Sequence, residues 1–327
     1  MSPLALTLPP ELRSAPRVRF KNILFATDLA STSAPAQTYA LLLARMFGSH
    51  LFALHVETGP GLAPRYEQLL WAASQKGQTF EEKERIEREK IADLEVFFRS
   101  AAVPFTLLLE SGEVREALDR VVEEHAIDLI ILGSHGRKGL SHLLLGSMAE
   151  NVSRSSTCPV ITVGPRARSG FETSLKKIVY ATDFSDESRL ALPYAVSLAQ
   201  EFHAELLVTH VAPERMSHDR VQVENYLMNR LRNIAPQSRF PWCTVSHIVT
   251  FGDPASRILE TAKDHNADLI VLGLHSSVQF TSHFPERFAY SVVCDASCPV
   301  MSVLPSTREV KLVKLPAEFL DRAPHMC

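Results

Sequence analysis

One stretch of this sequence places glycines, hydroxyl groups and basic side chains at a spacing suited to binding an anion. It reads Gly133-x2-Gly136-x9-Gly146-Ser147 and lies between an apolar run and a stretch that predicts a helix. Glycine lets a backbone turn sharply and approach a ligand closely, because it has no Cβ. The first amides of a helix attract anions, Ser147 adds a hydroxyl, and Arg137 and Lys138 add positive charge. These are the parts that a polyphosphate site needs.

The spacing matches neither of two common phosphate-binding patterns. It lacks the G-x4-G-K-[ST] of a P-loop and the G-x-G-x-x-G of a dinucleotide-binding turn. A structural interpretation stays open, in which Gly133 is only a turn and Ser147 only a helix N-cap. Because the whole four-part pattern falls between a strand and a helix, we favour ligand binding.

The chain repeats itself, and its 327 residues suit two domains. Residues 20–30 (FKNILFATDLA) align with 175–185 (LKKIVYATDFS), and residues 128–133 (DLIILG) align with 268–273 (DLIVLG). The two alignments differ in register by 15 residues. The first copy therefore carries an insertion between Val56 and Gly112.

Each copy alternates short apolar runs with longer helical patterns, which predicts a parallel sheet covered by helices on both faces. In the first copy the predicted strands are 22–26, 51–56, 105–109, 128–132 and 160–163, and the later helices are near 79–100, 113–125 and 147–155. Ligands of such sheets bind at the carboxyl ends of the strands, where the strand order reverses. We therefore expect the site at the loops after Ala26, Val56 and Leu132.

Two helical patterns indicate which side chains face the core. Residues of the same types recur at the same spacing in both copies: Ala36, Ala40, Leu43, Ala44 and Phe47 match Ala191, Ala195, Leu198, Ala199 and Phe202. In the charged stretch 79–100, we expect Ile86, Leu94, Phe97 and Phe98 to point inward and the charges to be solvated.

Composition excludes several classes of protein. A net charge of −3 gives no electrostatic reason to expect nucleic acid as a partner. No apolar run approaches the roughly 20 residues of a membrane span, and residues 1–19 read as a tail without a signal peptide. The five cysteines are odd in number and scattered, and Cys294 and Cys298 read as buried apolar residues. We expect a reduced cytoplasmic protein.

The sequence resembles the universal stress protein family in its tandem two-domain form. The matching pieces are Ala-Thr-Asp28, His-Val56, the glycine pattern of residues 133–147, and Cys-Pro-Val160. The resemblance covers domain 1 at 20–164 and domain 2 at 175–304, with a linker at 165–174 and a C-terminal tail at 305–327. It implies two domains of Rossmann-like, adenine nucleotide α-hydrolase-like fold, each a five-stranded parallel sheet with helices on both faces.

The resemblance also implies ATP, with Mg2+, as the ligand of the first copy. Ala26 to Asp28 would line the adenosine, the Val56 backbone would meet the adenine, and the loop from Gly133 would hold ribose and phosphates. The implied binding residues are Ala26, Thr27, Asp28, Val56, Gly133, Ser134, His135, Gly136, Arg137, Lys138, Gly139, Gly146, Ser147, Met148 and Ala149.

The second copy lacks most of this pattern. Gly273 remains, but Ser276, Glu286 and Arg287 replace the second glycine, the third glycine and the serine. A carboxylate at a helix N-terminus is favourable by about 0.3–1 kcal/mol, so Glu286 would satisfy the anion site itself and repel a nucleotide. We expect one ATP per chain.

Two candidate residues have counterparts in that degenerate copy. Asp183 matches Asp28, so a structural and a ligand-binding role are equally supported for Asp28. His275 matches His135, which favours a structural role for this histidine over catalysis.

The resemblance also implies that the last strand of each domain, 160–163 and 300–303, pairs with the other inside one chain, which would cover an edge that an open sheet leaves unpaired. A homo-oligomer on other surfaces is also open. The function that the resemblance implies is regulatory ATP binding in a stress response. The alternatives are a slow ATPase, for which no catalytic residue is evident, and an interaction scaffold that binds no nucleotide.

Overall fold

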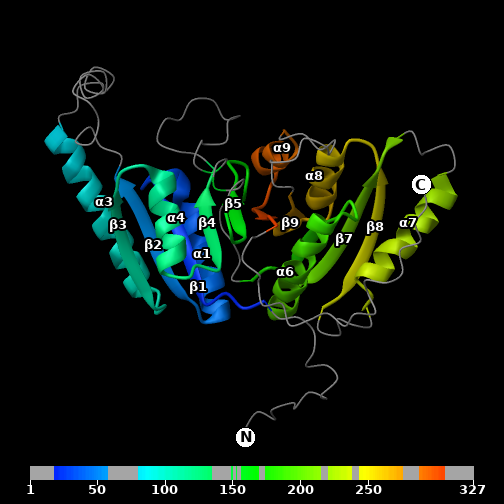
Figure 1. Cartoon of the computed structure of the whole chain (residues 1–327), viewed down its shortest axis with the longest axis horizontal. Coiled ribbons are helices and arrows are strands. Elements are labelled where there is room, and N and C mark those ends of the chain that lie inside the picture. The colour runs from blue at the N-terminus through cyan, green and yellow to red at the C-terminus, as the bar shows by residue number, and fades with distance from the viewer. Residues whose placement is uncertain are drawn as a thin grey trace, which may run out of the picture.

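The strands of both copies join in one continuous sheet. The computed structural model of the chain describes residues 18–57, 80–134, 149, 152, 156–168, 174–214, 220–237, 243–274 and 287–305. Within them, ten strands form a sheet in the order β3-β2-β1-β4-β5-β10-β9-β6-β7-β8 (Figure 1). The strands of the first copy are β1 (Asn22–Thr27), β2 (His50–Glu57), β3 (Phe105–Ser111), β4 (Leu129–Gly133) and β5 (Val160–Val163). Those of the second are β6 (Lys177–Ala181), β7 (Glu205–Ala212), β8 (Val245–Phe251), β9 (Leu269–Gly273) and β10 (Val300–Val303).

All strand pairs inside a copy are parallel, and the order reverses at the first strand of each copy. β1 lies between β2 and β4, and β6 lies between β7 and β9. The α/β prediction and the five-strand count of each copy are confirmed. The reversal places the predicted ligand edge at the carboxyl ends of β1, β2 and β4.

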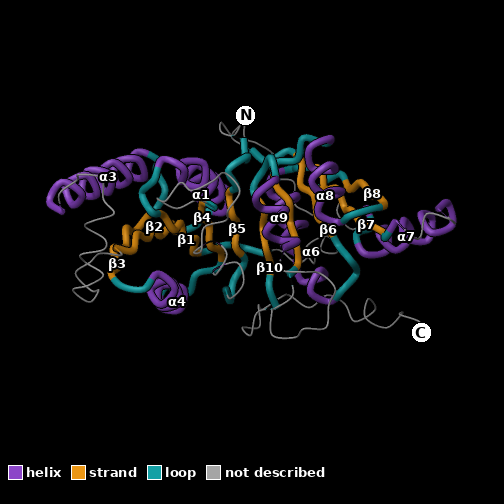
Figure 2. Tube along the Cα trace, turned by 90° about the horizontal axis from the view of Figure 1, so that it is seen from above, coloured by secondary structure: helices purple, strands orange, loops and turns teal. Residues whose placement is uncertain are grey.

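Helices cover both faces of the sheet. In the first copy they are η2 (Ser31–Ser33), α1 (Ala34–Phe47), α3 (Phe80–Ser100) and α4 (Val114–Glu124). In the second they are α6 (Asp186–Phe202), α7 (Arg220–Ile234), α8 (Pro254–Asp264) and α9 (Arg287–Asp295). One buried cluster lies beneath α1, α3, α6 and α7, and another beneath α4, α8 and α9. Figure 2 shows α1 and α3 on one side of the first-copy strands and α4 on the other.

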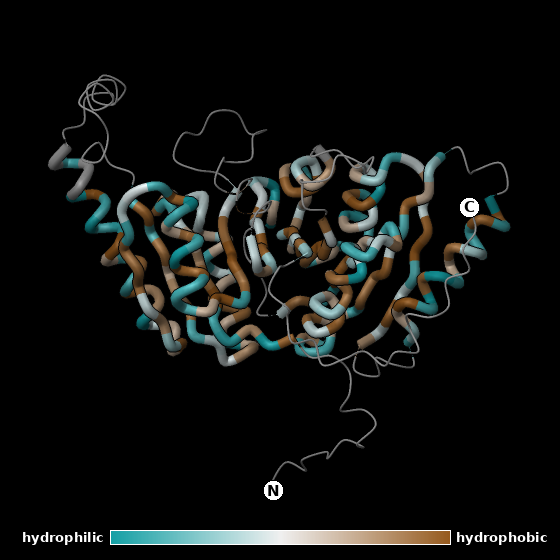
Figure 3. Tube along the Cα trace, in the orientation of Figure 1, coloured by the Kyte–Doolittle hydropathy of each residue, from teal (hydrophilic) through white to brown (hydrophobic). Residues whose placement is uncertain are grey.

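The small side chains predicted for the core faces do pack there. Ala36, Ala40 and Ala44 of α1 are buried, and so are their counterparts in α6. In α3, Leu94 and Phe98 are buried, whereas the prediction for Phe97 is wrong because 37% of it is exposed. Its neighbour Phe98 takes the inward position, and a helix turns by 100° between successive residues. Figure 3 shows the apolar residues concentrated along the strands.

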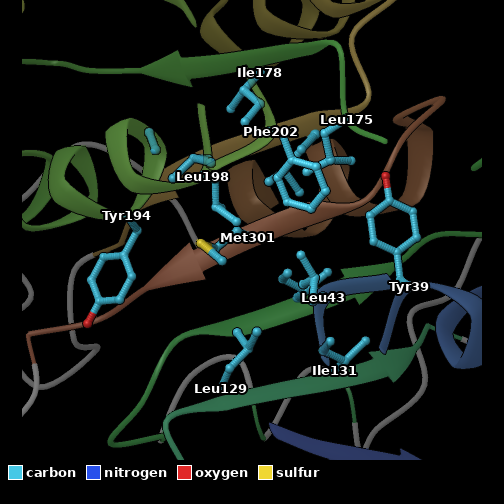
Figure 4. Packing of buried hydrophobic residues seen from close by; sticks show 14 of the residues in the cluster. Tyr39, Leu43, Leu129, Ile131, Leu175, Ile178, Tyr194, Leu198, Phe202 and Met301 are labelled. Atoms are coloured by element: carbon cyan, nitrogen blue, oxygen red, sulfur yellow. The ribbon is translucent and has the colours of Figure 1, made fainter. Parts of the chain in front are cut away.

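The two copies meet through their last strands, as predicted. β5 and β10 pair antiparallel, with Ile161 opposite Met301. Two hydrogen bonds reinforce the junction: the Tyr39 hydroxyl donates to the Asp268 carbonyl, and the Val18 amide donates to Ser197 Oγ at 2.8 Å. Figure 4 shows Tyr39 and Leu43 of the first copy among side chains of the second copy, which include Leu175, Phe202 and Met301.

Two further observations concern membrane spans and the cysteines. Within the described ranges, no helix combines the length and the apolar character that crossing a bilayer requires. Cys294 and Cys298 are buried, as predicted, and burial raises the pKa of the Cys298 thiol to about 12.

Candidate nucleotide site at the strand edge

The structure brings the described part of the predicted site to one edge of the first-copy sheet. Ala26 lies between Leu54 and Leu132 in the strand register, and Thr27 lies beside His55. Val56 directly follows the buried part of β2, and Gly133 ends β4. Ser134 is buried next to Gly133, where its amide donates to the Val163 carbonyl at 2.9 Å.

The rest of the predicted set falls mainly outside the described residues. These are His135, Gly136, Arg137, Lys138, Gly139, Gly146, Ser147 and Met148. Ala149 is helical and buried in the cluster beneath α4. In the second copy, His275, Ser276 and Glu286 also lie outside the described residues, whereas Arg287 begins α9.

Asp28 organises the turn that follows β1. Its Oδ1 accepts the Ala30 amide at 3.0 Å and the Ser33 hydroxyl at 2.9 Å. Thr27 Oγ1 accepts the Leu29 amide at 3.0 Å, and Leu29 has φ = 60°, which is uncommon for a residue with a side chain. The structural role that the sequence allowed for Asp28 is therefore real, and Asp183 makes the matching bond to the Ser185 amide.

His55 has a place in the site that sequence reasoning missed. It is buried, with 4% of its side chain exposed, and Nδ1 lies 2.9 Å from the Thr27 carbonyl oxygen. Nε2 lies 2.7 Å from Oε1 of Glu87 on α3, whose side chain is 12% exposed. Recurrence of the histidine at His210 was a signal, but nothing in the sequence connects Glu87 to this strand.

The two copies differ in how the first helix begins. In the second copy, Ser185 caps α6 by accepting the Ser188 amide at 3.1 Å. Ala30 stands at the matching position of the first copy and offers no side-chain cap, and three residues of 3-10 helix replace the regular first turn. The Tyr180 hydroxyl also donates to the Ser188 carbonyl at 2.8 Å, whereas Phe25 has no hydroxyl. Among the described residues, a strand side chain thus donates to the helix start only in the second copy, whereas Ser33 of the first copy bonds to Asp28 in the turn after β1.

This difference changes the space at the strand edge. A Cβ added to Gly133 would find its nearest atoms, those of Ser33 and Thr32, at 3.6 Å, an ordinary van der Waals distance. A Cβ added to Gly273 would lie 2.2 Å from the main-chain oxygen of Glu187, which is an impossible contact. The first copy therefore leaves room for about one methyl group where the second copy is closed.

The second-copy histidine has different surroundings. His210 Nδ1 lies 2.8 Å from the Thr182 carbonyl oxygen, but its ring packs on Phe184 at 4.4 Å between centroids. The Arg230 guanidinium carbon lies 3.9 Å above the other ring, that of Phe184. Burial, with a smaller contribution from the Arg230 charge, lowers the pKa of His210. A positive charge thus stands near His210 where the first copy has a carboxylate.

Comparison with known proteins gives a consistent match. A family model described as the universal stress protein family matches twice, over residues 19–164 and 174–303. A universal stress protein of Methanocaldococcus jannaschii is 27% identical over 155 residues, which cover 45% of this chain and 96% of that protein. One of Mycobacterium tuberculosis is 27% identical over 181 residues, which cover 53% of this chain and 61% of that protein.

Two solved structures share the two-copy fold. A universal stress protein from Archaeoglobus fulgidus has a TM-score of 0.58 at 19% identity, covering 86% of this chain and 98% of that one. A putative universal stress protein from Pseudomonas aeruginosa has a TM-score of 0.61 at 17% identity, covering 88% of this chain and 94% of that one. At these identities the likeness shows the fold alone.

Proposed function

Because the chain belongs to the universal stress protein family, in its tandem two-domain form, we propose that it is a regulatory protein that binds one ATP, in its first copy. Nucleotide binding would bias a conformation or a surface that cytoplasmic partners recognise. Both the number of sites and the identity of the ligand are part of the proposal.

One observation carries this proposal: among the described residues, the edge of the first-copy sheet has room for an added Cβ at Gly133, and the matching edge of the second copy has none at Gly273. The contrast is between 3.6 Å at Gly133 and 2.2 Å at Gly273 for an added Cβ. It is independent of the glycine spacing, because the start of α6 produces it. Two separate features, the loop sequence and the strand-edge packing, thus favour the first copy.

The residues present suit a nucleotide in three ways. The strand-order reversal between β1 and β4 is where ligands of parallel sheets bind. Ala30 leaves the following helix start without a side-chain cap. The loop after Gly133 carries Arg137 and Lys138, which would bind phosphate oxygens of Mg-ATP. Ala26, Thr27, Asp28 and Val56 would line the adenosine end of the proposed site.

The test is thermal unfolding with and without Mg-ATP, on the natural protein and on Gly136→Glu. A ligand that binds only the folded state stabilises it by about 2.7 kcal/mol at a concentration one hundred times its Kd. We expect this gain for the natural protein and its loss in Gly136→Glu. Absence of any gain would favour a scaffold that binds no nucleotide.

Titration calorimetry tests the stoichiometry. We expect one site per chain, and the same affinity in a Glu286→Gln variant as in the natural protein. Two tight sites per chain would contradict the proposal, since the second copy would then accommodate a nucleotide despite its closed edge.

A further inference from the structure

We propose that His55 and Glu87 hold one proton between them and act as positioning residues, connecting α3 to the strand edge so that nucleotide affinity of the first copy falls as pH rises. This inference rests on the proposed function for its ligand. The shared proton itself depends only on the two hydrogen bonds of His55. The feature belongs to the first copy alone, which provides a comparison within the same chain.

The hydrogen bonds require the extra proton. The Thr27 carbonyl can only accept, so His55 Nδ1, at 2.9 Å, must carry a hydrogen. In a neutral imidazole, Nε2 would then be an acceptor. Glu87 Oε1 lies 2.7 Å from Nε2, and an ionised carboxylate is also only an acceptor. Two acceptors cannot bond at this distance, so one further proton lies between the two residues.

Because the pair is buried, its contact depends on this proton. The two side chains are only 4% and 12% exposed, so water cannot replace the missing hydrogen bond when the proton leaves. A carboxylate oxygen that faces a nitrogen lone pair at 2.7 Å in such a place is strongly unfavourable. Loss of the proton is therefore expected to separate Glu87 from His55 and to loosen α3 at this point.

The charged side chains near His55 can be named for the described elements around it. From the elements around His55, the side chains to consider are Glu87 of α3, Asp28 after β1, Glu57 of β2, Leu109 of β3 and Arg45 of α1. Asp28 is hydrogen bonded to Ser33 and to the Ala30 amide, Glu57 is exposed, and Leu109, beside His55 in the register, has no charge. Arg45 donates to the Ala101 carbonyl at 2.9 Å. The described contacts thus leave Glu87 as the charged partner of the imidazole.

The pair connects two parts of the proposed site to α3. Thr27, whose carbonyl His55 holds, directly precedes Asp28 and is itself a proposed binding residue. His55 directly precedes Val56, whose backbone is proposed to meet the adenine. Figure 2 shows α3 running along the same side of the sheet as α1. A change at Glu87 therefore reaches both strand ends through one side chain.

His210 shows what the second copy lacks. Its Nδ1 bond to Thr182 is the same, but its ring packs on Phe184, and the Arg230 guanidinium also stacks on Phe184. Burial lowers the pKa of His210, and the positive charge of Arg230 opposes an added proton more strongly than the Asp183 carboxylate favours one. The second copy is therefore expected to show no such pH dependence.

The decisive variant is Glu87→Gln. A glutamine amide can donate to a neutral Nε2, so it keeps the hydrogen bond and removes the need for a proton. Glu89→Gln is the matched control on the same helix, since Glu89 pairs with Arg85 at the surface, with both side chains more than 60% exposed. ATP affinity would be measured by calorimetry from about pH 6 to about pH 9 for all three proteins.

We expect the affinity of the natural protein to fall relative to that of Glu87→Gln by about tenfold across this range, which is the loss of a charge-assisted hydrogen bond. Glu89→Gln should follow the natural protein. Identical pH profiles for the natural protein and Glu87→Gln would overturn the inference.

A second measurement needs no ATP and separates this inference from the proposed function. Amide hydrogen-exchange protection of residues 85–94 in ligand-free protein should fall between pH 6 and pH 9 in the natural protein and stay constant in Glu87→Gln. If ATP bound neither protein but this contrast appeared, the shared proton would stand and the nucleotide proposal would fail. Equal protection profiles in the two proteins would refute the shared proton whether or not ATP binds.

Discussion

The Tyr180 hydroxyl donates to the main-chain oxygen of Ser188 at 2.8 Å, and this bond holds the start of α6 against the sheet. Ser188 also bonds through its own hydroxyl to Thr182 Oγ1 at 2.9 Å. In the first copy Phe25 and Ser33 stand at these places, and Ser33 turns instead to Asp28 at 2.9 Å. The Tyr180 hydroxyl, which Phe25 lacks, thus occurs in the copy where an added Cβ does not fit at the strand-end glycine.

Replacing that ring tests the bond directly. Tyr180→Phe is expected to lower the free energy of unfolding by about 1 kcal/mol, the usual worth of a buried hydrogen bond. Denaturant unfolding would measure it. Tyr226→Phe is the control, because Tyr226 is exposed on α7 and its loss should change stability by less than about 0.5 kcal/mol. Equal effects of the two substitutions would show that the Tyr180 bond is not what holds α6.

The two strand-end glycines should respond differently to alanine. Gly273→Ala places a methyl group against the Glu187 main chain, and such overpacking costs about 1–3 kcal/mol. Gly133→Ala meets only ordinary contacts, so the ligand-free protein should unfold at nearly the same temperature, while its stabilisation by Mg-ATP should decrease. Thermal unfolding of both variants checks this. An undamaged Gly273→Ala protein would mean that the second edge is open after all.

Contacts across the β5–β10 junction should contribute to the stability of the whole chain. Tyr39→Phe removes the hydroxyl that donates to the Asp268 carbonyl, so the junction loses one hydrogen bond. A loss of about 1–2 kcal/mol is expected, measured by calorimetry. Because one sheet runs through both copies, both should still unfold together. A separate early transition of one copy would contradict this expectation.

The buried tyrosine hydroxyls predict a loss of folding stability at alkaline pH. Burial raises the pKa of Tyr180 and of Tyr194 to about 12, and it also raises the pKa of Tyr39. The unfolded chain releases these protons near pH 10, so stability present below that pH is lost as pH rises towards 12. For Tyr180 alone the loss is roughly 2–3 kcal/mol. Unfolding by denaturant at several pH values would measure it, and Tyr180→Phe should lose less.

Much of the architecture was determined by local sequence. Apolar runs such as that of β4, and small residues at helical spacing such as Ala36 and Ala40, carry their structure in their own periodicity. The internal repeat predicted two like domains, and the family resemblance predicted the pairing of β5 with β10, which covers one edge of each open sheet. The sequence also placed Asp28, Val56 and Gly133 at one strand edge, because parallel strands end together.

Other features depend on contacts between residues distant in the chain, and only the tertiary structure decided them. Glu87 meets His55 because α3 packs against β3, the strand that pairs with β2, and local sequence does not determine this placement. The close approach of α6 to Gly273 depends on the hydrogen bond of the Tyr180 hydroxyl. Both Phe97 and Phe98 were predicted to face inward, but only Phe98 is buried. Periodicity specifies which side of an element is apolar. It does not specify how far two elements approach, and that distance separates a closed edge from one that can admit a ligand.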